Sequence, residues 1–214
     1  MALLETRKIQ KHFAGVVALD QVDFSCDKGR ITGLLGANGS GKSTLAKIIT
    51  GVYHADAGEI LYRGRRVRYG NPAESKRNGI SMIFQNLSLV EDLTVWQNIV
   101  LGCEKKKGTV LDDAWAKAEA QKILTDLWPK LDIHRYVYQL SPGEMQIVEI
   151  TKALICKPEL LIMDEPTAAL EREQVNSLFA YIRKLAGQQT AIVFTSHRMR
   201  EVMEICDNVV VFRN

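Results

Sequence analysis

The residues with the clearest chemistry form a glycine-rich loop close to the N-terminus. Gly36 to Thr44 reads GANGSGKST, which fits the pattern G-x-x-x-x-G-K-[ST], and it lies between a strand-like apolar run and a helix-like run. Glycines let the backbone curl so that several N–H groups point at one anion, and the following helix adds the partial positive charge of its N-terminus. The loop therefore predicts a phosphate-binding site. The residues expected to bind there are Gly36, Asn38, Gly39, Ser40, Gly41, Lys42, Ser43 and Thr44.

Two side chains of this loop have the chemistry to bind a nucleotide together with its metal ion. Lys42 is expected to reach the β- and γ-phosphate oxygens, and Ser43 is expected to place its hydroxyl on Mg²⁺. The alternative is a glycine-rich turn that only connects a strand to a helix. Because both flanking elements have the pattern that the motif requires, the phosphate-binding interpretation is favoured.

A pair of carboxylates follows a predicted buried strand later in the chain. Residues 160–163 are a continuous apolar run, typical of a central parallel strand, and Asp164 and Glu165 come directly after it. Ligands of open α/β sheets bind at the carboxyl ends of the strands. Asp164 is therefore expected to hold Mg²⁺ through water, and Glu165 to orient and polarise an attacking water. Two simple turn residues are the alternative.

Two further polar residues follow other predicted core strands. His197 comes after the strand at residues 191–194 and is expected to donate a hydrogen bond to the γ-phosphate at the same sheet edge as Glu165. Gln85 comes after the strand at residues 80–84 and is expected to touch Mg²⁺ and the attacking water. A lone histidine or glutamine is more often structural, so both assignments depend on the loop and on the carboxylate pair.

A helix predicted to begin near residue 142 has a complete N-terminal cap. Ser141 is the predicted N-cap, Pro142 takes the first helical position, and Glu144 completes a capping box. The N-terminus of a helix that displays Ser141 and Gly143 is also ready to bind an anion. The alternative is a cap that only starts a helix.

The periodicity of the chain predicts an α/β fold. Strands are expected near residues 3–10 and 17–26, and strands alternate with helices again after residue 158. This alternation predicts a mainly parallel sheet with helices on both faces. Between about 94 and 157 the pattern is helical with no obvious strand, so the sheet is interrupted by an all-helical insertion.

Composition and charge are those of an ordinary globular chain. Its 214 residues are 46% apolar and 25% charged, and the net charge of +3 is too small to indicate a nucleic-acid partner. The cysteines are far apart and are expected to be buried, reduced thiols; they are Cys26, Cys103, Cys156 and Cys206. No signal peptide and no bilayer-spanning run are expected, so any work at a membrane would depend on a partner.

Taken together, these motifs resemble the ATP-binding cassette of ABC transporters. They follow along the chain in the family's order: Walker A (residues 36–44), Q-loop (Gln85), signature (residues 140–144), Walker B (residues 160–165), D-loop (residues 169–171) and switch histidine (His197). The stretches most similar to the first cassette of the fused two-cassette ATPases of monosaccharide importers are residues 15–20, 93–102, 146–150 and 196–198.

The resemblance implies a fold and a domain organisation. The fold is a P-loop NTPase core with a mainly parallel sheet, an N-terminal antiparallel β subdomain and an all-helical insertion. Residues 1–85 and 158–214 are expected to form the RecA-like ATP-binding core with the β subdomain, and residues 86–157 the helical signature subdomain.

The resemblance also implies the ligands and the roles of the site residues. ATP and Mg²⁺ are the expected cofactors, and Phe13 is expected to stack on adenine. Ser141 and Gly143 are expected to close over the γ-phosphate held by a facing cassette. The expected catalytic residues are Glu165, His197, Gln85 and Lys42, and the expected metal-binding residues are Ser43, Gln85 and Asp164.

The implied activity is ATP hydrolysis coupled to uptake of a small solute, here a monosaccharide. The implied partners are a second cassette, fused in a longer protein or supplied by a second copy, transmembrane permease subunits and, indirectly, a solute-binding protein, with no nucleic acid. The expected location is cytoplasmic, peripheral on the inner face of the cell membrane. The alternatives are a soluble ABC ATPase without a transport role and a cassette that binds ATP with little hydrolysis.

Three features depart from the family pattern. Pro142 and Glu144 replace a glycine and a glutamine of the signature, and the Glu144 carboxylate is expected close to the docking γ-phosphate, where like charges repel. Glu171 stands where the D-loop usually has Asp or a small polar residue. The chain stops at Asn214, where such importers continue, so one domain of a longer protein is expected.

Overall fold

The computed structural model describes residues 2–107 and 109–213. The chain divides into two compact units, which are described separately. The first contains residues 1–82, 158–165 and 183–214, and the second contains residues 83–157 and 166–182. The predicted boundaries left residues 166–182 in the core, whereas in the structure they group with the helical unit.

An antiparallel sheet forms the N-terminal part of the first unit. Its strand order is β2-β1-β4-β5, and its strands are β1 (Ala2–Phe13), β2 (Val16–Asp27), β4 (Ala57–Tyr62) and β5 (Arg65–Val67). Phe24 and Cys26 of β2 are buried while their neighbours are exposed, as the period of two in the sequence predicts. The predicted strands are therefore present, and β1 and β2 are longer than expected.

The second sheet of this unit positions the chemically interesting residues. Its order is β11-β3-β10-β9-β6, and its strands are β3 (Ile31–Leu35), β6 (Ile80–Ile83), β9 (Leu160–Asp164), β10 (Ala191–Thr195) and β11 (Asn208–Val211). The pairs of β3 with β10 and β11, and of β9 with β10, are parallel. Every residue of β9 and β10 is buried, which explains their unbroken apolar runs.

The helices of the first unit begin and end at residues that typically cap or terminate helices. They are α1 (Lys42–Ile49), which contacts β2 and β9, α2 (Pro72–Arg77) and α7 (Met199–Ile205). Asn71 caps α2 through its side chain, and Pro72 takes the first helical position. Gly51 follows α1 with φ of 77°, a left-handed conformation typical of a residue that ends a helix.

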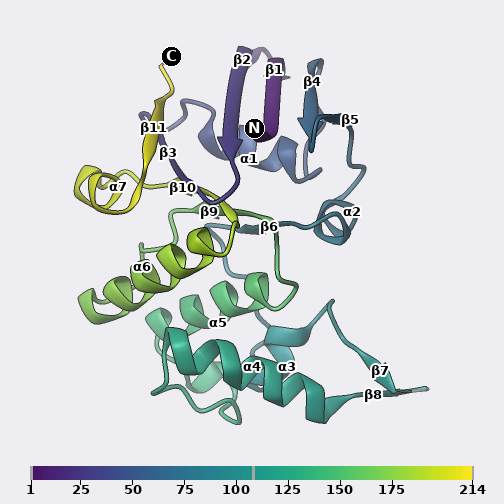
Figure 1. The fold of residues 1–214 in the computed structure, drawn as a ribbon, viewed down its shortest axis with the longest axis vertical. Helices are drawn as coiled ribbons and strands as arrows, with labels where there is room; N and C mark the ends of the chain where they lie inside the picture. Colours follow the sequence, from purple (N-terminus) through teal and green to yellow (C-terminus); the bar gives the residue numbers. More distant parts are fainter. Residues whose placement is uncertain (1, 108, 214) are drawn as a thin grey trace. The chain divides into compact units, whose positions relative to one another are not determined.

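The second unit is mostly helical. It contains α3 (Val95–Val100), α4 (Asp113–Leu127), the 3₁₀ helix η1 (Val137–Gln139) and α5 (Pro142–Leu154), and α6 (Arg172–Gly187) begins in it. Helices α3, α4 and α5 contact one another (Figure 1). Their apolar faces supply the core of this unit, including Ile99, Leu124, Ile147 and Ile150. No described helix in either unit is both long and apolar enough to cross a membrane.

Two expectations for this unit are wrong. A short antiparallel ribbon, β7 (Lys106–Lys107) and β8 (Val110–Leu111), lies where no strand was expected; Gly108, between them in the sequence, lies outside the described residues. Cys103 and Cys156 form a disulfide across 53 residues of chain, whereas reduced thiols were expected. The sequence could not predict this pairing, because only packing brings the chain after α3 close to the end of α5. Cys26 and Cys206 are free.

Candidate functional site

The glycine loop is shaped by backbone conformations that other residues disfavour. Gly41 has φ of 93°, and a Cβ there would lie 2.5 Å from the Ala18 carbonyl oxygen. A Cβ at Gly36 would lie 2.4 Å from Ser40 Oγ. Both positions therefore require glycine, which gives the loop its tight curve. Asn38 and Gly39 are exposed at its tip.

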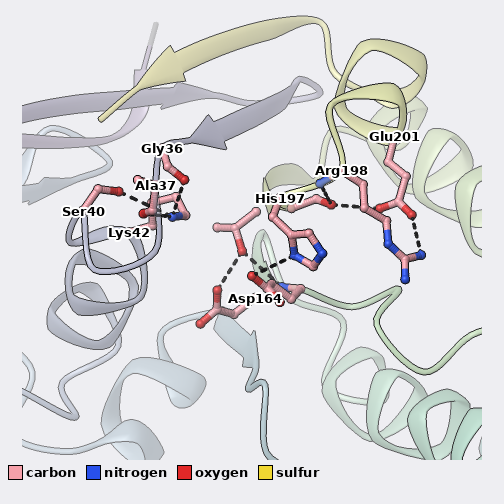
Figure 2. Close-up of polar contacts among 11 residues, drawn as sticks. Gly36, Ala37, Ser40, Lys42, Asp164, His197, Arg198 and Glu201 are labelled. Atoms are coloured by element: carbon pink, nitrogen blue, oxygen red, sulfur yellow. Dashed lines mark hydrogen bonds and ion pairs between the residues drawn. The ribbon is translucent and has the colours of Figure 1, made fainter. Parts of the chain in front are cut away.

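Lys42 is the centre of this loop. Its side chain is buried at the start of α1, and Nζ donates to the carbonyl oxygens of Gly36 and Ala37, each at 2.9 Å (Figure 2). Nζ also lies 3.4 Å from Ser40 Oγ. The N-cap of α1 is Gly41, which has no side chain to cover the N-terminus of the helix. A buried ammonium beside an uncovered helix start fits the binding of a polyphosphate.

The carboxylate pair lies at the end of β9, as predicted. Asp164 is buried, and its Oδ1 accepts a 2.7 Å hydrogen bond from the hydroxyl of Thr195. The backbone N–H of Glu165 donates to the same hydroxyl at 3.1 Å, and Glu165 has φ of 50°. This left-handed turn takes the chain sharply out of the sheet. Thr195, paired with Asp164 in the parallel register, therefore holds both acidic residues.

His197 faces the second of these acids. Its Nδ1 lies 3.3 Å from Glu165 Oε1, which brings together two residues that are 32 positions apart in the sequence. The prediction that both leave the sheet at one edge is confirmed by this contact. The imidazole is more than half exposed and the carboxylate is mostly covered, so a ligand could reach the histidine from solvent.

A second network holds the loop that carries His197. The buried carboxylate of Glu201 accepts from Ser196 Oγ at 2.9 Å and from Arg198 Nη1 at 3.1 Å. The backbone N–H of Arg198 donates to Ser196 Oγ at 3.0 Å. Both neighbours of the histidine are therefore fixed to the first turn of α7, and Figure 2 shows the contact of Arg198 with Glu201.

The residues that could hold a nucleotide and a metal ion in this unit have suitable chemistry. Mg²⁺ takes one or two protein oxygens and completes its shell with phosphates and water, and Asp164 and the Ser43 hydroxyl are such oxygens. Ser43 and Thr44 lie in the first turn of α1 and are partly exposed. Among residues 2–107 and 109–213, no three His, Cys, Asp or Glu side chains gather into a metal-binding cluster.

Phe13 lies at the end of β1, in the same unit. Its ring is 37% exposed, with the edge of the Tyr53 ring at a centroid distance of 5.1 Å and the Lys11 ammonium 5.3 Å from its centroid. An exposed aromatic ring flanked by a cation could stack against a purine. Tyr53 was not identified from the sequence.

The other predicted site residues lie in the second unit. Gln85 is exposed, two residues after β6 ends. The segment that follows it is tied to α5 through Ser88, whose hydroxyl donates to the buried Glu149 carboxylate at 2.8 Å. Lys152 Nζ donates to the Ser88 carbonyl oxygen, also at 2.8 Å. This clamp was not predicted.

The start of α5 confirms the predicted capping box. Glu144 N donates to Ser141 Oγ at 3.3 Å, and Ser141 N donates to Glu144 Oε2 at 2.8 Å. Gly143 lies against Gln174, so closely that a Cβ would be 2.6 Å from its Oε1. That oxygen also accepts from the N–H of Glu171 at 3.0 Å, which links the signature-like segment to the start of α6.

The Glu144 carboxylate is turned back onto its own unit. Its Oε1 accepts from Arg135 Nη1 at 2.8 Å, while Oε2 is held by Ser141. Burial by itself would raise the pKa of Glu144, but the Ser141 N–H and the Arg135 guanidinium outweigh it and hold the pKa below its usual range. Glu144 is therefore a paired carboxylate. Sequence reasoning missed Arg135, because nothing local connects it with Glu144.

Comparison with known proteins identifies the family. The model of the ABC transporter family matches residues 19–168. The chain belongs to this family. The match confirms the resemblance predicted from the motifs, and it includes the phosphate loop, the capped start of α5 and the carboxylate pair.

Its relatives within the ABC transporter family are import proteins. Across 99% of its length the chain is 43% identical to the ribose import ATP-binding protein of Caldanaerobacter subterraneus subsp. tengcongensis. It is 42% identical to the galactose/methyl galactoside import ATP-binding protein of Clostridium perfringens, again over 99% of its length. These matches cover 43% and 41% of the relatives, so the chain spans less than half the length of the curated relatives it matches.

A solved structure confirms the fold class. A nucleotide-free ATP-binding cassette from an ABC transporter superposes with a TM-score of 0.88 at 31% sequence identity. The match covers 99% of this chain and 88% of that one. The predicted combination of a parallel sheet, an antiparallel sheet and helices is therefore that of an ABC cassette.

Proposed function

We propose that this chain is the ATP-binding and ATP-hydrolysing domain of an ABC importer that takes up a monosaccharide. The observation that carries the proposal is the buried Lys42 ammonium at the uncovered start of α1, in one unit with Asp164, Glu165 and His197. The sugar is inferred from the relatives, which are a ribose import ATP-binding protein and a galactose/methyl galactoside import ATP-binding protein.

Binding of ATP depends on the loop residues. Lys42 exchanges its carbonyl partners for β- and γ-phosphate oxygens, and the N–H groups of the loop and of the first turn of α1, with the hydroxyls of Ser43 and Thr44, surround the phosphates. Phe13 stacks on adenine. Ser43 and Asp164 would hold Mg²⁺, with Gln85 predicted from the sequence as a further ligand, and the ion would neutralise charge on the phosphate oxygens.

Hydrolysis depends on the residues that follow β9 and β10. Glu165 accepts a hydrogen bond from the attacking water and orients it in line with the γ-phosphate. His197 donates a hydrogen bond to a γ-phosphate oxygen, and its 3.3 Å contact with Glu165 keeps the two groups aligned. Gln85, which belongs to the second unit, is predicted from the sequence alone to touch the attacking water.

Coupling to transport requires partners. A second cassette, from the same longer protein or from a second copy, presents its Walker A loop to Ser141 and Gly143 of this chain. Closure and reopening of the pair drive permease subunits, which receive the solute from a solute-binding protein. The domain then works on the cytoplasmic face of the membrane, held there by the permease.

Replacement of Lys42 tests the binding site. Lys42→Ala is expected to weaken MgATP binding at least ~10-fold, because a charge-assisted contact contributes roughly 1.5–3 kcal/mol. Titration calorimetry measures this, with Lys28→Ala as a matched control, since Lys28 is an exposed lysine paired with Glu159 in the same unit. Equal affinities of parent and Lys42→Ala would contradict the proposed role of the loop.

A further inference from the structure

The unexplained feature of the second unit is the guanidinium of Arg135. It lies nine residues before Glu144, in the turn that precedes η1. Nη1 donates to Glu144 Oε1 at 2.8 Å, and Nη2 donates to the carbonyl oxygen of Gln139. Arg135 therefore makes two contacts at the same time, one with the residue before the signature segment and one with the first turn of α5.

Both oxygens of the Glu144 carboxylate have hydrogen-bond donors. Glu144 Oε1 is held by Arg135 and Oε2 by the N–H of Ser141, so neither oxygen is free to turn outward without losing a charge-assisted bond. Ser141 Oγ accepts from Glu144 N, which leaves its hydroxyl hydrogen available to another acceptor. The side chains of Arg135 and Glu144 are 35% and 21% exposed, so water screens the pair only in part.

The location of this pair matters because a phosphate is expected there. A helix N-terminus attracts an anion through its uncovered N–H groups and its dipole. An unpaired carboxylate in the first turn would repel the same anion. The sequence alone predicted that conflict for Glu144, and the structure resolves it by placing a cation on the carboxylate.

We propose that Arg135 is a positioning residue for phosphate binding at the start of α5. It holds Glu144 in its capping geometry and cancels its charge, so that the Ser141 hydroxyl and the N–H of Gly143 meet the phosphate of a facing cassette. The inference rests on the proposed function, since that function supplies the facing phosphate.

A charge-rescue experiment tests this role in a Glu165→Gln background, which slows hydrolysis. ATP-dependent association is measured by sedimentation velocity for Arg135→Ala, Glu144→Gln and the double variant. Arg135→Ala is expected to weaken association about tenfold at low salt, and the loss is expected to shrink at high salt, where exposed charges are screened. The double variant is expected to regain the affinity of Glu144→Gln, because no carboxylate is left to repel the phosphate.

Matched variants separate charge from folding. Arg135→Lys keeps the cation while changing the bond to Gln139, and it is expected to remain close to the parent. Lys130→Ala breaks another ion pair of the same unit, the 2.7 Å contact with Glu173, and is expected to change nothing. If the parent does not associate as an isolated chain, the same variants are compared by the ATP hydrolysis rate of the assembled importer, with Glu165 intact.

The outcomes are distinct. A double variant as weak as Arg135→Ala would show that Arg135 only supports the fold, and an unaffected Arg135→Ala would show that the pair does not influence phosphate binding; both overturn the inference. Calorimetry with MgATP on the same samples separates failure of the Arg135 inference from failure of the proposed function. Parent protein that binds no ATP would contradict the function itself, whatever the Arg135 variants do.

Discussion

Single residues at the ends of β9 and β10 carry the proposed chemistry, and Thr195 hydrogen-bonds to two of them, Asp164 and Glu165. It is fully buried, and its hydroxyl both donates to Asp164 Oδ1 and accepts from the N–H of Glu165. Buried carboxylates are costly unless each oxygen has a partner. Thr195 supplies one of these partners to the buried Asp164 carboxylate.

Replacing Thr195 with an isostere tests this dependence. Thr195→Val is expected to lower the free energy of unfolding by about 1–3 kcal/mol, because it leaves a buried carboxylate oxygen without its donor. Urea unfolding measures the change, and Thr195→Ser, which restores the hydroxyl, serves as the control. Equal stability of the Val variant and the parent would mean that water replaces the hydroxyl at no cost.

At the scale of elements, the second unit is held by connections between helices that are distant in the sequence. The Ser88 clamp ties the segment after Gln85 to α5, and the Cys103–Cys156 disulfide ties the chain after α3 to the end of α5. Helix α5 thus begins at the signature segment and is joined along its length to the Gln85 segment and to α3. A displacement of one of these segments would therefore displace the others through α5.

The disulfide gives a prediction for stability. Reduction with dithiothreitol is expected to lower the free energy of unfolding by up to about 4 kcal/mol, the chain-entropy value for a closed loop of 53 residues. Urea unfolding with and without reductant measures this. Dithiothreitol should have no effect on a Cys103→Ser/Cys156→Ser variant, since Cys26 and Cys206 are free. Alkylation of all four cysteines of unreduced, unfolded protein, read by mass spectrometry, would contradict the pairing.

At the scale of the whole molecule, the proposed hydrolysis and transport belong to an assembly. The chain covers less than half of its import relatives, and it belongs to a family of transporters although none of its described helices can cross a membrane. The proposed transport cycle must therefore be tested with a second cassette and a permease present.

Glu165 is the residue whose loss should separate ATP binding from transport. In the assembled importer, Glu165→Gln is expected to retain ATP binding while hydrolysis falls by roughly 10²–10⁴, because the water loses its general base or orienting acceptor. Uptake of labelled sugar is expected to stop. Glu204→Gln, an exposed glutamate on α7, is the control. Hydrolysis at the parent rate by Glu165→Gln would assign catalysis to another residue.

Much of the fold and of the site could be predicted because the signals are local. The glycine loop, the capping box of Ser141 and Glu144, and the apolar runs of β9 and β10 each depend on residues within a few positions of one another. The meeting of Glu165 with His197 was also predictable, since parallel strands end at one sheet edge. Short-range sterics, hydrogen bonding and periodicity suffice for such features.

The sequence by itself therefore determined the family, the α/β fold class, the phosphate loop and the acidic pair. Only the tertiary structure decided which distant residues these polar side chains bind: Arg135 for Glu144, Thr195 for Asp164, and Glu149 with Lys152 for Ser88. It likewise decided the disulfide and the grouping of residues 166–182 with the helical unit. The physical reason is that a side chain's partner is chosen by packing in space, and no periodicity along the chain records which distant residue arrives there.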